Sequence, residues 1–96
     1  MEKEVIVKWK IRASETPEIL KLLPELAEET KKEAGNLYYA IYQSEEDPNE
    51  LILHERYIDA EAQDAHRNSR HYQSIVVDKI MPYLEGREVH VIKKLI

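Results

Sequence analysis

The residues best suited to chemistry lie in one short stretch, Asp64 to Ser74, with the sequence DAHRNSRHYQS. It carries His66 and His71 five positions apart, with Tyr72 directly after the second histidine. Because imidazole takes up and releases protons near neutral pH, either histidine is a candidate general base. Residues five apart on one helix lie about 140° apart around its axis, so the pair lacks the i,i+4 spacing of a helical metal site. No carboxylate stands beside them at a known metal-ligand spacing, and we expect no metal.

The two histidines are expected on successive helices, because Asn68 and Ser69 break the pattern between them. His71 then lies in a first helical turn, where an exposed or half-buried side chain without a chemical role is the simpler interpretation. His66 lies one turn after Ala62, on the side of its helix that faces the predicted sheet. It either hydrogen-bonds a loop carbonyl or points into a gap between sheet and helices, where it would be a general base.

The first third of the chain predicts a strand followed by a helix. Residues near the N-terminus alternate between two faces, as in a half-buried strand. The core-facing set is Val5, Val7, Trp9 and Ile11. The helix has Ser14 or Thr16 as its candidate N-cap and Gly35 as its C-terminal stop. Pro24 lies inside this pattern and should kink the helix or split it in two.

The rest of the chain predicts a hairpin, two helices and a last strand. Residues 36–44 and 51–58 flank a polar Asp-Pro-Asn break and form the hairpin. Asp59 caps a short helix over residues 60–68, and Ser69 caps a second over 70–81. Pro82 and Gly86 end that helix, and residues 88–96 form the last strand.

This order, β-α-β-β-α-β, predicts one α+β domain over residues 1–96 with a ferredoxin-like fold: an antiparallel sheet with helices on one face. In the predicted strands at 36–44 and 51–58, apolar residues fall on both faces. A monomer would leave one of those faces in water, so we expect a homodimer formed through the sheet face.

Composition removes several classes of function. The net charge is −5 and no basic stripe is present, which argues against nucleic-acid binding. The chain has no cysteine, which excludes thiol chemistry and Cys-ligated clusters. Apolar runs are far shorter than the roughly 20 residues that cross a bilayer, and charges interrupt the apolar N-terminal stretch, so no membrane span or signal peptide is predicted. We expect a cytoplasmic protein.

The segment DPNELILHERYIDAEAQDAHRNSRHYQS resembles the antibiotic biosynthesis monooxygenase family. The matching positions are Asp47, Pro48, Glu55, Tyr57, Asp59, Ala62, His66, Ser69, His71 and Tyr72. Upstream, Glu33-Ala34-Gly35 is similar to the family's Glu-x-Gly before the second strand, and the resemblance extends from about Val5 to Leu95. Tyr57 stands where a tryptophan is common in the family, which affects the expected shape of the pocket.

The resemblance implies a dimeric α/β barrel with a pocket between sheet and helices. Family members include oxygenases that attack phenols or hydroquinones with O₂ and need no flavin, haem or metal, because the deprotonated substrate supplies the electrons. His66 would be the base, and Glu55 would orient it or hold a substrate hydroxyl. The substrate would lie against aromatic and polar walls, formed by Trp9, Tyr39, Tyr57, His71 and Tyr72.

Other interpretations stay open. Trp9 and Tyr39 could belong to the core alone, and Glu55 could form a structural ion pair with Lys8 or Lys10. The superfamily also contains isomerases of phosphorylated carbonyl compounds, for which His66 and Glu55 would serve equally well. Haem degradation is not expected, because the residues that the haem-degrading branch uses do not match here. A non-catalytic dimer that binds a small ligand is the remaining alternative.

Overall fold

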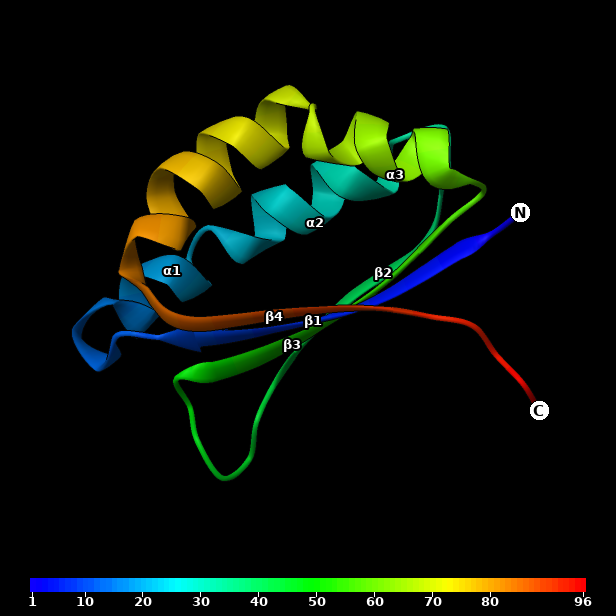
Figure 1. Ribbon diagram of the computed structural model, residues 1–96. Coiled ribbons are helices and arrows are strands. Elements are labelled where there is room, and N and C mark those ends of the chain that lie inside the picture. The colour runs from blue at the N-terminus through cyan, green and yellow to red at the C-terminus, as the bar shows by residue number, and fades with distance from the viewer.

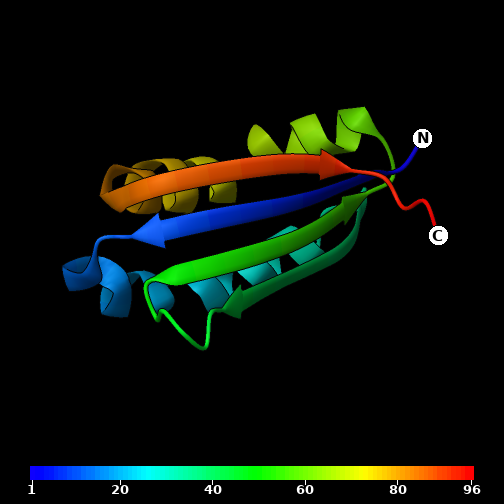
Figure 2. The same cartoon turned by 60° about the horizontal axis from the view of Figure 1, so that its bottom comes forward.

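The computed structural model describes all 96 residues of the chain, Met1–Ile96. Four antiparallel strands form one sheet in the order β2-β3-β1-β4, and the helices lie on one of its faces (Figures 1 and 2). The strands are β1 (Lys3–Ile11), β2 (Asn36–Gln43), β3 (Glu50–Tyr57) and β4 (Leu84–Ile92). The helices are η1 (Ala13–Glu15), α1 (Thr16–Leu20), α2 (Leu23–Lys31), α3 (Ala60–Arg67), η2 (Tyr72–Ile80) and η3 (Met81–Tyr83). The predicted ferredoxin-like α+β fold is confirmed.

The core lies between the sheet and the helices. Every second residue of β1 is buried, as the alternation predicts, and β3 shows the same pattern. The helices cover these strands with Ile19, Leu26, Ile75, Val76 and Ile80, all buried. Burying one such aliphatic side chain contributes about 1.5–3 kcal/mol, so the sheet and helices are held together mainly by apolar contact.

Pro24 splits the first helical segment, as predicted. α1 ends at Leu20, and α2 begins at Leu23 with Pro24 in its first turn, where the missing N–H of proline costs nothing. The prediction for Gly35 is wrong, because α2 already ends at Lys31 and no glycine has a positive φ. Gly35 is required by packing instead, since a methyl group at this position would overlap Cβ of Ala62 on α3.

The polar caps predicted for the second half form. An Asp59 carboxylate oxygen accepts a hydrogen bond from the backbone N–H of Ala62 (2.8 Å), and α3 starts there. Ser69 Oγ accepts from the backbone N–H of Tyr72 (3.2 Å) and donates to the carbonyl of His66 (2.6 Å). Ser69 therefore fixes the junction between the two helical segments. The π-helical winding of η2 was not predicted.

The predicted position of the last strand is wrong. β4 begins at Leu84 and ends at Ile92, so Gly86 lies inside the strand and residues 93–96 lie beyond it. The cause is the pairing with β1, which runs from Ile11 opposite Leu84 to Glu4 opposite Ile92. The ladder ends there because β1 itself begins at Lys3.

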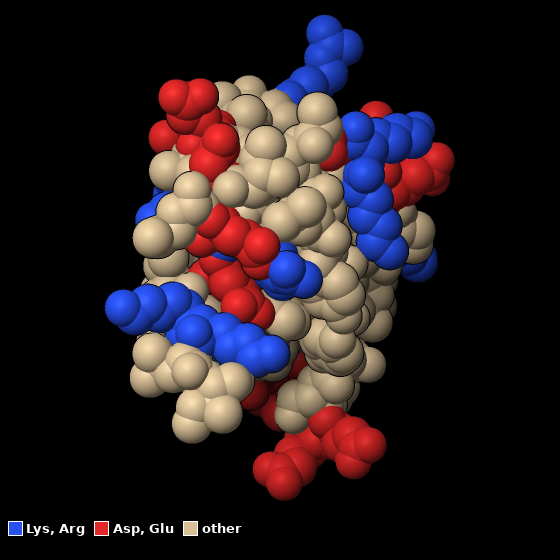
Figure 3. Space-filling model, turned by 90° about the vertical axis from the view of Figure 1, so that its right-hand side faces the viewer, with Lys and Arg blue, Asp and Glu red and all other residues tan.

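The sheet face away from the helices is less apolar than the alternation suggested. Its apolar members include Ile6, Ile52, Ile92, Tyr38 and Tyr42. Charged side chains lie among them: His54 contacts Glu4 (2.6 Å), and Lys8 pairs with Glu50 (3.5 Å). Acidic and basic groups also lie next to one another at the end of the molecule that carries both termini (Figure 3). None of the helices combines the length and apolar character needed to cross a bilayer.

Candidate active site

A cavity of about 220 Å³ lies between the sheet and the helical segments α3 and η2. All four strands contribute to its walls. Of the residues predicted for the site, the lining includes Trp9, Tyr39, Glu55, His66 and Tyr72. Trp9, Tyr39 and Glu55 lie on the helix-facing side of β1, β2 and β3, respectively. His66 comes from the last turn of α3.

His66 is buried in the wall of the cavity, with 3% of its surface exposed. Its Nδ1 lies 2.8 Å from Oε2 of Glu33, and its Nε2 lies 3.7 Å from Oε1 of Glu55. An ionised carboxylate can only accept, so the bond to Glu33 requires the proton of a neutral imidazole to sit on Nδ1. Nε2 then carries the lone pair on the side of Glu55. Such a carboxylate–histidine pair fixes the tautomer of a general base.

Glu55 is buried on β3, with 7% of its surface exposed. Burial raises the pKa of its carboxyl group, while the hydrogen bond from the Tyr57 hydroxyl (2.6 Å) and the nearby imidazole of His66 act in the opposite direction. The structural ion pairs considered for Glu55 do not form. Lys8 pairs with Glu50 and Lys10 with Asp47, on the other side of the sheet.

Tyrosine rings surround the imidazole of His66. The Tyr57 ring lies 5.3 Å from it between centroids, the Tyr72 ring 5.1 Å away in an edge-on arrangement, and the Tyr39 ring 6.0 Å away. Burial raises the pKa of both Tyr39 and Tyr57, so these phenols stay protonated at neutral pH. The base candidate therefore sits in an aromatic environment from which bulk water is largely excluded.

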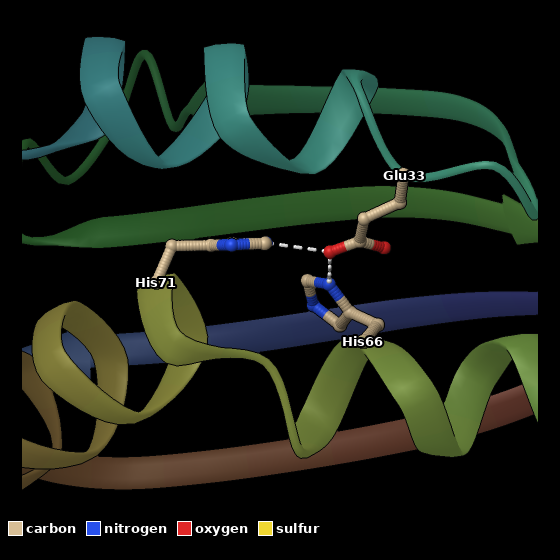
Figure 4. Close-up of side chains that lie close together, drawn as sticks. All are labelled: Glu33, His66 and His71. Carbon is tan, nitrogen blue, oxygen red and sulfur yellow. Dashed lines mark hydrogen bonds and ion pairs between the residues drawn. The ribbon is translucent and has the colours of Figure 1, made fainter.

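Two of the predicted substrate-binding residues do not line the cavity. Tyr57 is fully buried behind Glu55 and contacts it through the hydroxyl group. His71 points to Glu33 instead, with 2.5 Å between its Nε2 and the carboxylate oxygen that also contacts His66 (Figure 4). Both residues are therefore placed to support other side chains of the site.

Glu33 is the member of the site that sequence reasoning missed. It lies in the turn after α2, and Figure 4 shows its carboxylate between the two imidazole rings. Local spacing could not reveal it, because it comes 33 positions before His66. The usable signal was Glu33-Ala34-Gly35, since the glycine permits the close approach of this turn to α3. Glu33, His66 and His71 each offer one atom of a group that could hold a metal ion, and these atoms lie within 4.8 Å of one another.

The mouth of the cavity carries two arginines. Arg67 on α3 pairs with Asp64 (2.6 Å), whereas Arg87 on β4 forms no ion pair. Arg87 stands opposite Trp9 in the β1–β4 register, which aims it at the helix-facing side of the sheet. Two other basic residues of this half of the chain, Arg70 and Lys79, do not line the cavity.

Trp9 lines the cavity, but its indole Nε1 is not part of the cavity surface. This atom is buried and has no hydrogen-bond partner within the protein.

Comparison with known proteins identifies the family. Residues 4–77 match the family described as antibiotic biosynthesis monooxygenase. The chain belongs to the antibiotic biosynthesis monooxygenase family. This confirms the resemblance drawn from residues 47–74. No curated protein matches the chain significantly.

Solved structures agree over nearly the whole chain. A crystal structure described as an antibiotic biosynthesis monooxygenase is 25% identical, with a TM-score of 0.92 and 99% of both chains covered. Rv0793 from Mycobacterium tuberculosis is 29% identical, with a TM-score of 0.89, covering 99% of this chain and 96% of its own. A conserved protein from Methanosarcina mazei Go1 is 28% identical, with a TM-score of 0.88 and coverage of 98% and 93%.

The antibiotic biosynthesis monooxygenase match covers the site except for its part on β4. Glu33, Glu55, His66 and Arg67 fall within residues 4–77, whereas Arg87 of β4 falls outside them.

Proposed function

We propose that this protein is a monooxygenase that oxidises a small phenol or quinol with O₂, without flavin, haem or metal in the reaction. The observation that carries the proposal is the orientation of His66. Glu33 holds Nδ1 of the imidazole at 2.8 Å, and Nε2 lies on the side of Glu55 in an aromatic cavity. A substrate hydroxyl oxygen about 2.8 Å from Nε2 would donate its one hydrogen to that nitrogen.

The reaction needs only a base and an enclosed site. Nε2 of His66 takes the phenol proton, and the resulting anion passes one electron to O₂. Superoxide and the ring radical then combine at a ring carbon bearing hydrogen, forming a peroxide. Loss of water converts that carbon to a carbonyl, so one oxygen atom enters the product and the other leaves as water. The substrate supplies all four electrons that reduce O₂, two for the oxygen that enters the product and two for the oxygen that leaves as water.

The remaining residues suit this chemistry. Tyr39, Tyr72 and Trp9 give flat apolar walls for an aromatic ring. A cavity of about 220 Å³ is smaller than the ~300–1,000 Å³ of typical ligand pockets, which favours one small substrate over a substrate together with an organic cofactor.

We also propose that the protein acts as a homodimer through the sheet face that the helices leave uncovered. Tyr42 is half exposed there, and Tyr38 is also exposed. Apolar area of this kind is a usual part of interfaces, and the charged side chains among it would fix the register of the two sheets.

The test is oxygen uptake with a panel of hydroquinones and polyphenols, after subtraction of autoxidation and with metal-free buffers. We expect uptake with the native protein and a rate at least about 100-fold lower with His66→Ala. The matched control is His90→Ala, which removes an exposed histidine that contacts Glu88 outside the cavity. Label from ¹⁸O₂ should enter the product as one atom. Equal rates in the native protein and His66→Ala would refute the role of the histidine.

A second candidate, isomerisation of a phosphorylated carbonyl compound, is favoured by Arg67 and Arg87 at the mouth of the cavity. Guanidinium groups bind phosphate well, and the same base could move a proton between carbons next to a carbonyl. Proton exchange of phosphorylated hydroxyketones in D₂O, followed by NMR, tests it. Exchange that depends on His66 and Arg87, without oxygen uptake, would favour the isomerase.

A further inference from the structure

The cluster of Glu33, His66 and His71 converges on one point from three separate elements. Glu33 comes from the turn after α2, His66 from the end of α3, and His71 from the residue before η2 (Figure 4). All three side chains are mostly buried, with 16%, 4% and 16% of their surface exposed. Two imidazole nitrogens therefore meet one carboxylate at a site that is shielded yet reachable from solvent.

We propose that Glu33, His66 and His71 bind one divalent metal ion of the zinc kind, with Zn²⁺ as the representative ion. The donor set, two imidazoles and one carboxylate, suits zinc and its neighbours rather than Mg²⁺ or Ca²⁺, which prefer oxygen alone. Water would occupy the fourth position. This proposal concerns a ligand that the oxygenase reaction does not use.

The three donor atoms are close to the spacing that a tetrahedral zinc ion requires. Glu33 Oε2 now lies 2.8 Å from His66 Nδ1 and 2.5 Å from His71 Nε2, and all three atoms fall within 4.8 Å of one another. Zinc bonds of about 2.1 Å at tetrahedral angles place ligand atoms roughly 3.4 Å apart. The carboxylate oxygen would withdraw by less than about 1 Å, and the two imidazole nitrogens would approach each other by up to about 1.4 Å.

The surroundings add a second, independent observation. Glu55 stands 3.7 Å from the other ring nitrogen of His66, in the position where metal-ligating histidines usually have a carboxylate. Oε1 of Glu33 is buried and has no hydrogen-bond partner within the protein, so this carboxylate has unused acceptor capacity.

Metal binding would also switch off the proposed base, and this consequence rests on the proposed function. A neutral imidazole that gives its Nδ1 lone pair to a metal carries its proton on Nε2. His66 Nε2 would then donate to Glu55 and could not accept a proton from a phenol. The site would therefore act as an inhibitory one, at which zinc and oxidation of the substrate exclude each other.

The first experiment is calorimetric titration of tag-free protein with Zn²⁺. We expect one ion per chain, and at least about tenfold weaker binding in His71→Ala and in Glu33→Gln. The matched controls, His54→Ala and His90→Ala, each remove a histidine that contacts a carboxylate outside the cluster, and they should bind as the native protein does. Absence of stoichiometric binding, or equal losses in the controls, would overturn the site.

Two further measurements keep the result interpretable. The visible spectrum of bound Co²⁺ should show tetrahedral coordination in the native protein and should lose this signature in His71→Gln. This variant keeps a polar side chain at position 71, so it serves if His71→Ala does not fold. Where oxygen uptake is measurable, Zn²⁺ should abolish it in proportion to occupancy, and a chelator should restore it. Full oxygen uptake by protein fully occupied with zinc would refute the inhibitory role. If the metal-free protein binds zinc but shows no oxygen uptake, the result would count against the oxygenase function and would still support the metal site.

Discussion

Replacing Gly35 with alanine should destabilise the fold and disturb the site at the same time. A Cβ atom at position 35 would overlap Cβ of Ala62 and lie 3.4 Å from Cγ1 of Ile58. Overfilling a packed contact costs about 1–3 kcal/mol, and the lower entropy of the unfolded alanine chain offsets about 0.4–1 kcal/mol of that. The net loss should be about 1–2 kcal/mol. At roughly 4–8 °C per kcal/mol for a domain of this size, Tm should fall by about 4–16 °C.

The assay is urea unfolding followed by circular dichroism, with Gly86→Ala as the control. The same added methyl at position 86 would meet only Cβ of Lys10, at an ordinary 3.5 Å, so this variant should lose no stability and should gain up to about 1 kcal/mol from the lower entropy of its unfolded chain. Adding Ala62→Gly to Gly35→Ala should recover part of the loss, because it removes the atom that is overlapped. A Gly35→Ala protein as stable as the native one would refute the packing explanation.

The effect should extend to catalysis, because the contact between Gly35 and Ala62 holds the turn carrying Glu33 against the helix carrying His66. Gly35→Ala should therefore lose activity at temperatures where it is still folded. Gly86→Ala provides the comparison here as well.

Three further predictions concern stability. Burial raises the pKa of the Glu55 carboxyl group in the folded state, so ionising this group destabilises the native protein once the pH exceeds the ordinary glutamate range. Glu55→Gln cannot ionise, and its stability relative to the native protein should therefore increase as the pH rises. The difference in urea midpoints near pH 4 and pH 8 measures it, and a constant difference would contradict it. Asp59→Ala should cost about 0.5–2 kcal/mol through loss of the cap on α3, whereas Glu61→Ala, in the same turn, should cost less. Leu26→Ala should cost about 2–5 kcal/mol in the same unfolding assay, because Leu26 is completely buried under the sheet.

Features that depend on neighbouring residues could be predicted from the sequence. The alternation in β1, the division of the helix at Pro24 and the cap at Asp59 are each decided within a few positions, and all three are present. His66 was assigned to the inner side of its helix from its distance to Ala62 alone. Such features need no knowledge of which segments pair.

Features that depend on distant pairing were missed. β4 was placed four residues too late because its register is decided by β1, more than 70 positions earlier. Glu33 and Arg87 reach the site only once the sheet is assembled, and no local spacing connects them to His66. The cluster of Glu33, His66 and His71 could not be predicted for the same reason, since Glu33 lies in another part of the chain.

The last strand, β4, is both an edge of the sheet and a wall of the cavity. β4 is an edge of the sheet, and the helices leave its inner side partly open, with Val89 and Val91 exposed to 41% and 58%. Arg87 and Val89 also line the cavity mouth. An occupant of the cavity would cover this side of the strand and suppress its local opening. Slower amide hydrogen exchange along β4 would therefore report occupancy for any ligand, even one that the protein binds without transforming.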